Sequence, residues 1–361
     1  MPIEPPAAAD FLAELLNTPS PSGYEEKIQE CVRAYVDDAA DSVRTDIHGN
    51  VIAVTGDPQG PRLMFAGHCD QIGMLVTHVD EMGYVYAATI GGWDPQQLIG
   101  QSMTIWSAAG PVPAAISRKA IHLLKQEERK RVVDLTDMWL DIGASDREDA
   151  LSSVSIGDPI TLDLGFRELK NDLISGPGMD NKTGTWVVME AFRLAASADE
   201  TLRCQIHSAS TVQEEIGLRG ARTAAGSIDP DVGIAVDVTH ASDCPTVDKS
   251  TIGDVRLGRG PVIFRGPNVN NLLGARLVSL AEENEIPYQV AALGRAASND
   301  ANVLQTHGGG VATGLVCVPN RYMHSGVEVI SRQDIQNAAK LLSLFALSLS
   351  SEDDFTPRPS A

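Results

Sequence analysis

Histidines and carboxylates that could bind a divalent metal ion follow several short apolar runs of this sequence. His68 comes just after the apolar residues 63–66, and Asp237 ends the run 233–236. In open α/β sheets, ligands bind in the crevice beyond the carboxyl ends of the strands, so we expect such side chains to converge. The candidate residues are His68, Asp70, Asp180, Glu214, Glu215, Asp237 and His324.

Taken singly, each of these residues is better explained as structural, because a histidine after a strand is usually hydrogen-bonded within the fold and a carboxylate before a helix usually caps it. Together they bring many acids to one sheet edge, and buried acids stay ionised only beside a compensating cation. Two divalent cations balance three ligand carboxylates and one bound hydroxide, which requires one carboxylate to bridge. Imidazole and carboxylate ligands without thiolate suit zinc, cobalt or manganese, and two such ions about 3.5–4 Å apart activate water in hydrolases.

The elements that must position these residues alternate between strand and helix after about residue 166, which indicates an α/β layered sheet. The N-terminal part adds a helix at 8–17 and strands at 51–54 and 62–68. The expected C-terminal elements are strands at 204–212, 234–238 and 314–318 and helices at 183–196, 271–284 and 334–347.

Two local patterns predict how the ends of these elements behave. Ser22 and Glu25 have the spacing of a capping box, in which the hydroxyl and the carboxylate each bond a free amide at the start of a helix. The polar tail from Ser350 predicts a frayed C-terminus.

Residues 72–165 have a different sequence pattern, with short β-like runs that indicate an inserted β-rich module. The runs 74–79 and 84–89 flank Asp-Glu-Met-Gly as a β-hairpin would. We therefore expect an α/β domain made of residues 1–71 and 166–361, with a β-barrel-like domain of residues 72–165 inserted in it.

Composition and charge exclude several classes of partner. The chain has 361 residues, 43% of them hydrophobic, and a formal net charge of −20, which repels nucleic acid and anionic membrane surfaces. No run of about 18 apolar residues predicts a membrane span. Its 5 cysteines include no CxxC pair, so neither a disulfide framework nor a thiolate zinc site is indicated. A reducing, cytoplasmic location fits best.

Several motifs resemble the tetrahedral (TET) aminopeptidases, the glutamyl-aminopeptidase or "cellulase M" family of dinuclear metallopeptidases. The resemblance spans nearly the whole chain and includes two motifs inside the inserted module. The motifs are GHCDQIG at 67–73, IGGWD at 90–94, DIGA at 141–144, DNKTG at 180–184, VQEEIGLRGA at 212–221, DVTH at 237–240, NDAN at 299–302 and RYMHS at 321–325.

The resemblance implies a three-layer α/β/α metallopeptidase domain that binds two metal ions, zinc or cobalt above all. Asp180 would bridge the ions, and a cis peptide bond would follow it. His68 and Asp237 would complete one site, and Glu215 and His324 the other.

The resemblance also implies the catalytic and substrate-binding residues. Glu214 would be the general base that takes a proton from metal-bound water and returns it to the leaving amine, while Asp70 would orient the imidazole of His68. Both glutamates must face the metals, which an extended strand forbids, so we expect a turn at 214–215. Asn299, Asp300 and His240 would contact the substrate.

Finally, the resemblance implies that the 72–165 module is a dimerisation domain and that six dimers form a hollow homododecamer, which trims short peptides. A related two-metal carboxypeptidase or deacylase is the main alternative, and a non-catalytic assembly scaffold is another. A glycosidase is disfavoured, because it needs two free carboxylates beside the scissile bond and these acids are better explained as metal ligands.

Overall fold

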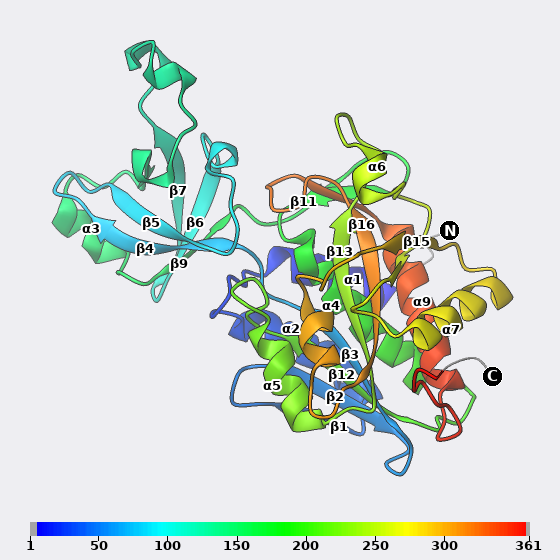
Figure 1. Ribbon diagram of the computed structural model, residues 1–361. Coiled ribbons are helices and arrows are strands. Elements are labelled where there is room, and N and C mark those ends of the chain that lie inside the picture. Colours follow the sequence, from blue (N-terminus) through cyan, green and yellow to red (C-terminus); the bar gives the residue numbers. More distant parts are fainter. Residues whose placement is uncertain (1–5, 359–361) are drawn as a thin grey trace.

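The computed structural model describes residues 6–358, which form a larger α/β body and a smaller β-barrel that stands apart from it (Figure 1). The chain leaves the α/β body after β3, builds the barrel, and returns to the α/β body after β9. Within residues 6–358, no helix is long and apolar enough to cross a membrane.

Eight strands form the central sheet of the α/β body, in the order β1-β2-β12-β3-β13-β16-β14-β15. The central neighbours β12, β3, β13 and β16 run parallel, so their carboxyl ends lie at one edge of the sheet. The antiparallel partners β2 and β14 flank them. The strands are β1 (Ser42–Thr45), β2 (Val51–Gly56), β3 (Arg62–His68), β12 (Gln205–Thr211), β13 (Val232–His240), β14 (Val262–Arg265), β15 (Gln289–Ala292) and β16 (Ala312–Asn320).

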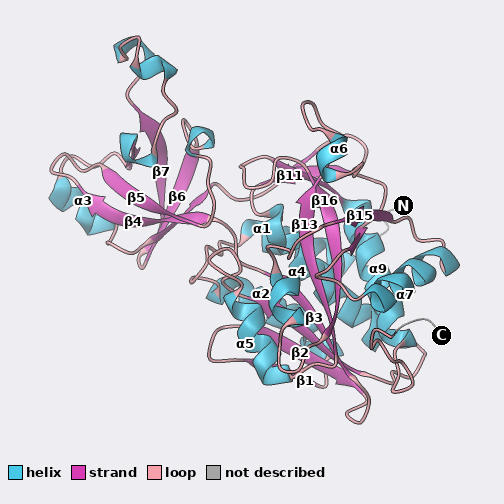
Figure 2. Ribbon diagram, viewed as in Figure 1, coloured by secondary structure: helices cyan, strands magenta, loops and turns pink. Residues whose placement is uncertain are grey.

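Helices cover both faces of this sheet and produce three layers (Figure 2). Successive strand residues point to opposite faces, so Phe65 packs in the core with α1, α2, α4 and α9, whereas Met64 packs with α5 and α8. Because these parallel strands are buried on both faces, their sequences are continuous apolar runs. The predicted α/β class is confirmed. The helices of the α/β body are α1 (Pro6–Asn17), α2 (Glu26–Val36), α4 (Met179–Ala196), α5 (Arg219–Ile228), α6 (Lys249–Ile252), α7 (Asn271–Glu283), α8 (Asp300–Gln305) and α9 (Arg332–Ser348). The helix α3 (Arg147–Ser153) packs on the barrel instead.

The smaller body is a closed barrel of six strands with a hydrophobic core of its own. Its first two strands form the predicted hairpin. A separate three-stranded sheet, in the order β10-β11-β17, lies in the α/β body. These strands are β4 (Gly73–Val79), β5 (Val85–Ile90), β6 (Ser102–Ser107), β7 (Gly110–Arg118), β8 (Met138–Asp141), β9 (Pro159–Leu162), β10 (Arg167–Glu168), β11 (Leu173–Gly176) and β17 (Glu328–Ser331).

The predicted capping box at the start of α2 is wrong. The Ser22 hydroxyl donates to Asp70 Oδ2 at 2.6 Å, far away in the sequence, and Glu25 accepts the backbone N–H groups of Gly23 and Gln213. The N-cap residue of α2 is Glu25 and not Ser22, and no side-chain hydrogen bond caps this helix.

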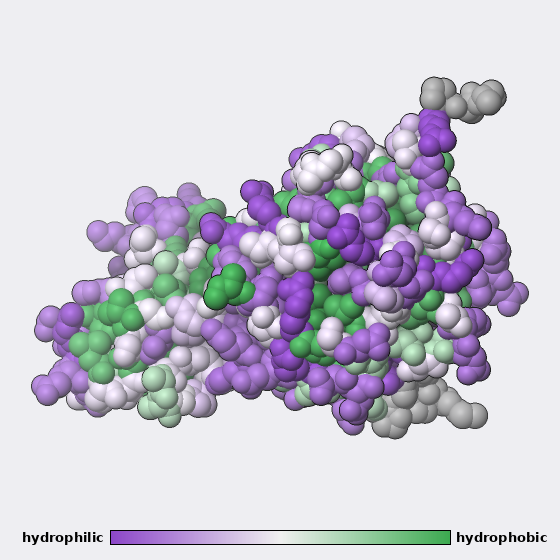
Figure 3. All heavy atoms as spheres, turned by 90° about the horizontal axis from the view of Figure 1, so that it is seen from below, coloured by the Kyte–Doolittle hydropathy of each residue, from purple (hydrophilic) through white to green (hydrophobic). Residues whose placement is uncertain are grey.

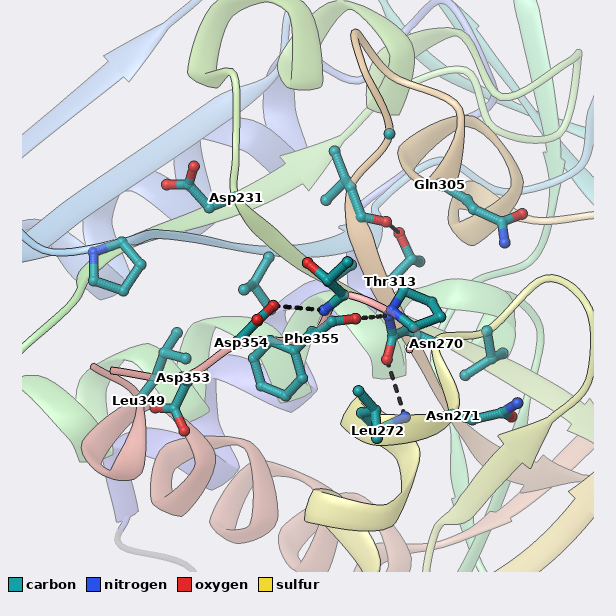
Figure 4. A pocket seen from close by; sticks show the side chains of 18 of the residues that line it. Asp231, Asn270, Asn271, Leu272, Gln305, Thr313, Leu349, Asp353, Asp354 and Phe355 are labelled. Carbon is teal, nitrogen blue, oxygen red and sulfur yellow. Dashed lines mark hydrogen bonds between the residues drawn. The ribbon is translucent and has the colours of Figure 1, made fainter. Parts of the chain in front are cut away.

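The predicted fraying from Ser350 is also wrong for the described part of the tail. The Phe355 ring stacks on Phe345 of α9 with ring centroids 6.4 Å apart, and the Phe355 carbonyl accepts a hydrogen bond from Asn270 (Figure 4). The tail lines a cavity of about 630 Å³ beside Asp231. Asp231 precedes β13, so this cavity lies at the amino ends of the parallel strands, opposite the edge where the histidines lie.

Candidate metal centre

The predicted histidines and acids meet at the edge of the sheet where the parallel strands end. They come from five separate segments, each fixed by a buried strand or helix of the α/β body. The residues are His68 at the end of β3, Asp180 at the start of α4, Glu214 and Glu215 after β12, Asp237 in β13, and His324 after β16.

His68 stands at the centre of one half of the cluster. Its Nε2 lies 3.4 Å from Asp180 Oδ1 and 3.7 Å from Asp237 Oδ1. Glu214 Oε2 lies 3.9 Å from the same nitrogen. One ligand atom each from His68, Glu214 and Asp237 lies within 4.8 Å of the others, so this group could hold a metal ion.

His324 organises the other half. Its Nε2 lies 3.2 Å from Asp180 Oδ2 and 3.4 Å from Glu215 Oε2. Asp180 therefore turns one oxygen to each imidazole. The cis peptide bond expected between Asp180 and Asn181 is present.

Both imidazoles are oriented with Nε2 toward the acids. His68 Nδ1 lies 3.2 Å from the Asp70 carbonyl oxygen, and His324 Nδ1 lies 2.8 Å from that of Gly92. An imidazole that donates Nδ1–H to a carbonyl leaves the Nε2 lone pair free for a metal ion, which is the usual arrangement of a metal-binding histidine.

The acids are crowded and buried, which disfavours their ionisation. Burial raises the pKa of Glu214 to about 10 and, with the charge of Asp180, that of Glu215 to about 7. Burial also opposes ionisation of Asp180, but hydrogen bonds from His324 and His68 outweigh it and lower the Asp180 pKa. Glu215 Oε1 is buried and has no hydrogen-bond partner within residues 6–358. Two divalent cations fit this donor set, because they would neutralise the acids and bind the free oxygen.

Asp70 holds the segment that carries both glutamates. Its carboxylate is fully buried and accepts the backbone N–H groups of Glu214 at 3.0 Å and Glu215 at 3.2 Å, besides the Ser22 hydroxyl. Gln213 adopts a left-handed conformation with φ of 55°, and the chain turns directly after it. The predicted non-extended turn is confirmed. Asp70 Oδ1 is also 3.4 Å from His68 Nδ1, so one carboxylate touches the predicted base, a ligand segment and an imidazole.

The residues expected to contact substrate lie in different environments. Asp300 is buried, its Oδ2 accepts from the Thr211 hydroxyl at 2.7 Å, and its Oδ1 has no partner within the described chain. Burial raises the Asp300 pKa to about 7. Asn299 uses its side chain to cap α8. His240 is exposed at the end of β13, and no hydrogen bond or ion pair of the described residues joins it to the cluster.

Sequence reasoning missed Glu328, which lies on β17 and is 2% exposed. Its carboxylate accepts backbone N–H groups from Asp180 and His324. Burial and the charge of Asp180 raise the Glu328 pKa to about 8. The available signal was one acid inside the apolar run Val-Glu-Val-Ile at 327–330, four residues after His324.

Comparison with known proteins agrees with the fold. The M42 glutamyl aminopeptidase family matches residues 49–341. The lysyl aminopeptidase of Pyrococcus furiosus is 36% identical over 351 residues, which cover 96% of this chain and 99% of that protein. The TET aminopeptidase of the marine sediment archaeon Thaumarchaeota archaeon SCGC AB-539-E09 superposes with a TM-score of 0.91, at 31% identity, over 96% of this chain and 97% of that chain. The Pyrococcus horikoshii TET1 peptidase superposes with a TM-score of 0.84, at 30% identity, over 95% of this chain and all of that one, and it can assemble into a tetrahedron or a large octahedral shell.

The fold and these relatives define a peptidase, a hydrolase that acts on peptide bonds. The chain belongs to the M42 glutamyl aminopeptidase family. The resemblance to the TET aminopeptidases seen in the sequence motifs is therefore confirmed.

Proposed function

We propose that this protein is an aminopeptidase that removes N-terminal residues from short peptides with the help of two divalent metal ions. The observation that carries the proposal is the position of Asp180, whose two carboxylate oxygens each face a different imidazole. In this proposal Asp180 would contribute to both ions. His68 and Asp237 would hold one ion, and Glu215 and His324 would hold the other.

Zinc or cobalt is the proposed metal, with manganese as an alternative, because imidazole and carboxylate ligands without thiolate accept each of them. Two bound ions would polarise the scissile carbonyl and make the attacking water more acidic. Glu214 takes one proton from that water as the water oxygen bonds to the carbonyl carbon. Glu214 then passes the proton to the amine nitrogen as the C–N bond breaks. Glu214 suits this role because its side chain adjoins His68 while Asp70 fixes its backbone.

The proposed substrate contacts are Asn299, Asp300 and His240. The best support is the free Oδ1 of Asp300, a buried acceptor whose carboxyl group lies close enough to Glu214 to raise the pKa of that residue. A buried acceptor of this kind can receive the free amino group of a peptide.

We also propose that residues 72–165 form a dimerisation domain, inserted in a catalytic domain of residues 1–71 and 166–361, and that dimers assemble into a homododecamer. The assembly of the horikoshii relative supports this, as do exposed hydrophobic residues on the barrel, among them Ile121, Leu123 and Val132. Figure 3 shows hydrophobic groups on one face of the barrel, within a largely hydrophilic surface. A cytoplasmic location is proposed because all five cysteines are free.

Hydrolysis of aminoacyl-anilides with Leu, Glu, Lys or Ala by metal-stripped protein, before and after addition of zinc, cobalt or manganese, tests the activity. We expect metal-restored cleavage of free-amine substrates and none of their N-acetylated forms, and the panel also identifies the preferred residue. Cleavage of N-acylated substrates instead would favour a deacylase, and release of C-terminal residues a carboxypeptidase. A mass of a lone dimer in light scattering would contradict the dodecamer.

Glu214→Gln tests the assignment of the base. The variant should lose about 100- to 10,000-fold in turnover, the usual contribution of a positioned general base, while its metal content stays unchanged. Glu190→Gln is a matched control, because Glu190 is also buried, at 3% exposure, but bonds to Tyr35 and Arg193. Full activity in Glu214→Gln would show that another group takes the proton.

A further inference from the structure

The carboxylate of Glu328 connects two candidate metal ligands through their backbones. Its Oε2 accepts the N–H of Asp180 at 2.9 Å, and its Oε1 accepts the N–H of His324 at 2.7 Å. Asp180 and His324 come from different elements, α4 and the loop after β16, and their side chains meet at 3.2 Å. One side chain thus fixes the relative position of both backbones.

Both of these backbone segments are irregular at the candidate ligands themselves, although an isolated bridge joins Arg321 to Val329 nearby. Tyr322 and His324 have left-handed φ angles of 62° and 60°, which non-glycine residues rarely adopt. Asp180 has φ of −79° and ψ of 105°, outside the helical region, although it lies at the start of α4. The two bonds from Glu328 are therefore a main restraint on the ligand pair.

The burial of the Glu328 carboxylate is costly. No ion pair of residues 6–358 includes Glu328, and Lys182, whose charge reaches it, donates its Nζ–H to the Thr18 carbonyl. A buried carboxylate without a charged partner is destabilising relative to an apolar side chain. The position of Glu328 is thus better explained by what it holds than by a gain in stability.

Asp70 is the counterpart of Glu328 in the other half of the cluster. It too is a buried carboxylate that accepts two backbone N–H groups, those of Glu214 and Glu215. Asp70 therefore restrains the segment with the base and one ligand, and Glu328 restrains the bridging ligand and the last histidine.

We propose that Glu328 is a positioning residue that sets the spacing of Asp180 and His324, and thereby the affinity for the metal ion held by His324 and Glu215. This inference rests on the proposed two-metal function. Glu328 touches neither substrate nor metal, and it acts only through the backbones of the ligands.

Titration of metal-stripped protein with Co²⁺, followed by calorimetry and by the visible absorption of bound cobalt, tests the proposal. Glu328→Gln keeps the shape of the side chain but replaces one carboxylate oxygen with an NH₂ group. An NH₂ group cannot accept a hydrogen bond from a backbone N–H, so the bond to either Asp180 or His324 is lost. We expect one Co²⁺ equivalent to bind about 10- to 100-fold more weakly than in the wild type and the other to change much less, which is the usual effect of removing a group that orients a ligand. Glu190→Gln, the matched control described above, should leave both equivalents unchanged.

The outcomes separate this inference from the proposed function. A wild-type protein that binds fewer than two Co²⁺ equivalents would refute the two-metal proposal itself. Two wild-type equivalents, with both affinities unchanged in Glu328→Gln, would overturn the role of Glu328 alone. An equal weakening of both equivalents would also overturn it, because that result would place the whole effect on Asp180, which is shared by both proposed sites, and not on the spacing of Asp180 and His324.

Hydrogen exchange of the metal-stripped wild type tests the same point without a variant that must fold. The amides of Asp180 and His324 should be protected to the level of the core strands, because each donates to a buried carboxylate. Exchange as fast as that of exposed loop amides would contradict the proposal.

Discussion

The spacing between β3 and α4 determines how closely the candidate ligands His68 and Asp180 approach each other, and Gly67→Ala would change that spacing. Gly67 precedes His68, and a Cβ at this position would lie 2.7 Å from the backbone of Gly184 in α4. This distance is 0.7 Å short of the 3.4 Å at which contact becomes ordinary, and helix backbone cannot rotate out of the way. The helix that carries Asp180 must therefore shift by a comparable distance from the strand that carries His68.

A shift of this size is large for a metal site, where ligand distances are held within about 0.2 Å. We expect Gly67→Ala to lower the free energy of unfolding by about 1–3 kcal/mol, as overpacking usually does. The affinity for the metal bound by His68 should fall, and activity should drop about 100-fold. Urea unfolding of metal-stripped protein and calorimetric titration with Co²⁺ measure the first two effects, and anilide hydrolysis measures the third.

Gly226→Ala is a control that should change the free energy of unfolding in the opposite direction. Gly226 is exposed on α5, and a Cβ added there would have no heavy atom within 4 Å outside its own helix backbone and chain neighbours. An alanine should stabilise the helix by about 0.5–1 kcal/mol and leave metal binding unchanged. If Gly67→Ala were as stable as the wild type and bound metal as tightly, the contact of β3 with α4 would not position the ligands.

Two further predictions concern stability away from the cluster. Burial, together with the charges of Arg44 and Arg62, lowers the pKa of His207 in the folded protein to about 4. The unfolded chain therefore binds the proton at a higher pH than the folded protein does. The stability due to the neutral imidazole is lost as the pH falls from about 6.5 to 4. Between pH 7 and pH 5 the free energy of unfolding should fall by about 1 kcal/mol less in His207→Gln than in the wild type, after allowance for the partial exposure of His207. Urea titrations at the two pH values measure both decreases, and equal decreases would refute this prediction. Phe355→Ala should lower the free energy of unfolding by about 1–2 kcal/mol in the same titrations at pH 7, because the half-buried ring stacks on Phe345. An unchanged free energy of unfolding would instead favour the frayed C-terminus predicted from the sequence.

The sequence was sufficient to predict the convergence of the candidate ligands, because that convergence follows from the type of sheet. An apolar run without alternation indicates a parallel strand buried on both faces, and His68 and Asp237 lie where such runs give way to polar residues. Parallel strands then bring those positions to one edge. The turn at Glu214 and Glu215 was predictable for a similar reason, since both side chains had to face the same way.

The contacts that support the cluster could not be read from the sequence, because their partners are distant along the chain. Ser22 has the correct local spacing for a cap, but it bonds to Asp70, which only the fold brings near. Glu328 stands in a short apolar strand, where a single acid reads as a solvent-facing residue of an edge strand. Phe355 follows a polar stretch, and nothing local indicates that it packs on α9.

The two backbone restraints explain why so many acids are kept in one buried place. Without a restraint, the segments that carry these crowded acids would be free to separate. Asp70 and Glu328 add further buried carboxyl groups, but each of them bonds to two N–H groups of those segments. The positions of the candidate ligands are thus held by the chain itself, and in the proposed two-metal function an ion would bind to an arrangement that already exists, which would reduce the ordering cost of binding. Loss of either restraint should therefore weaken metal binding more than it weakens the fold.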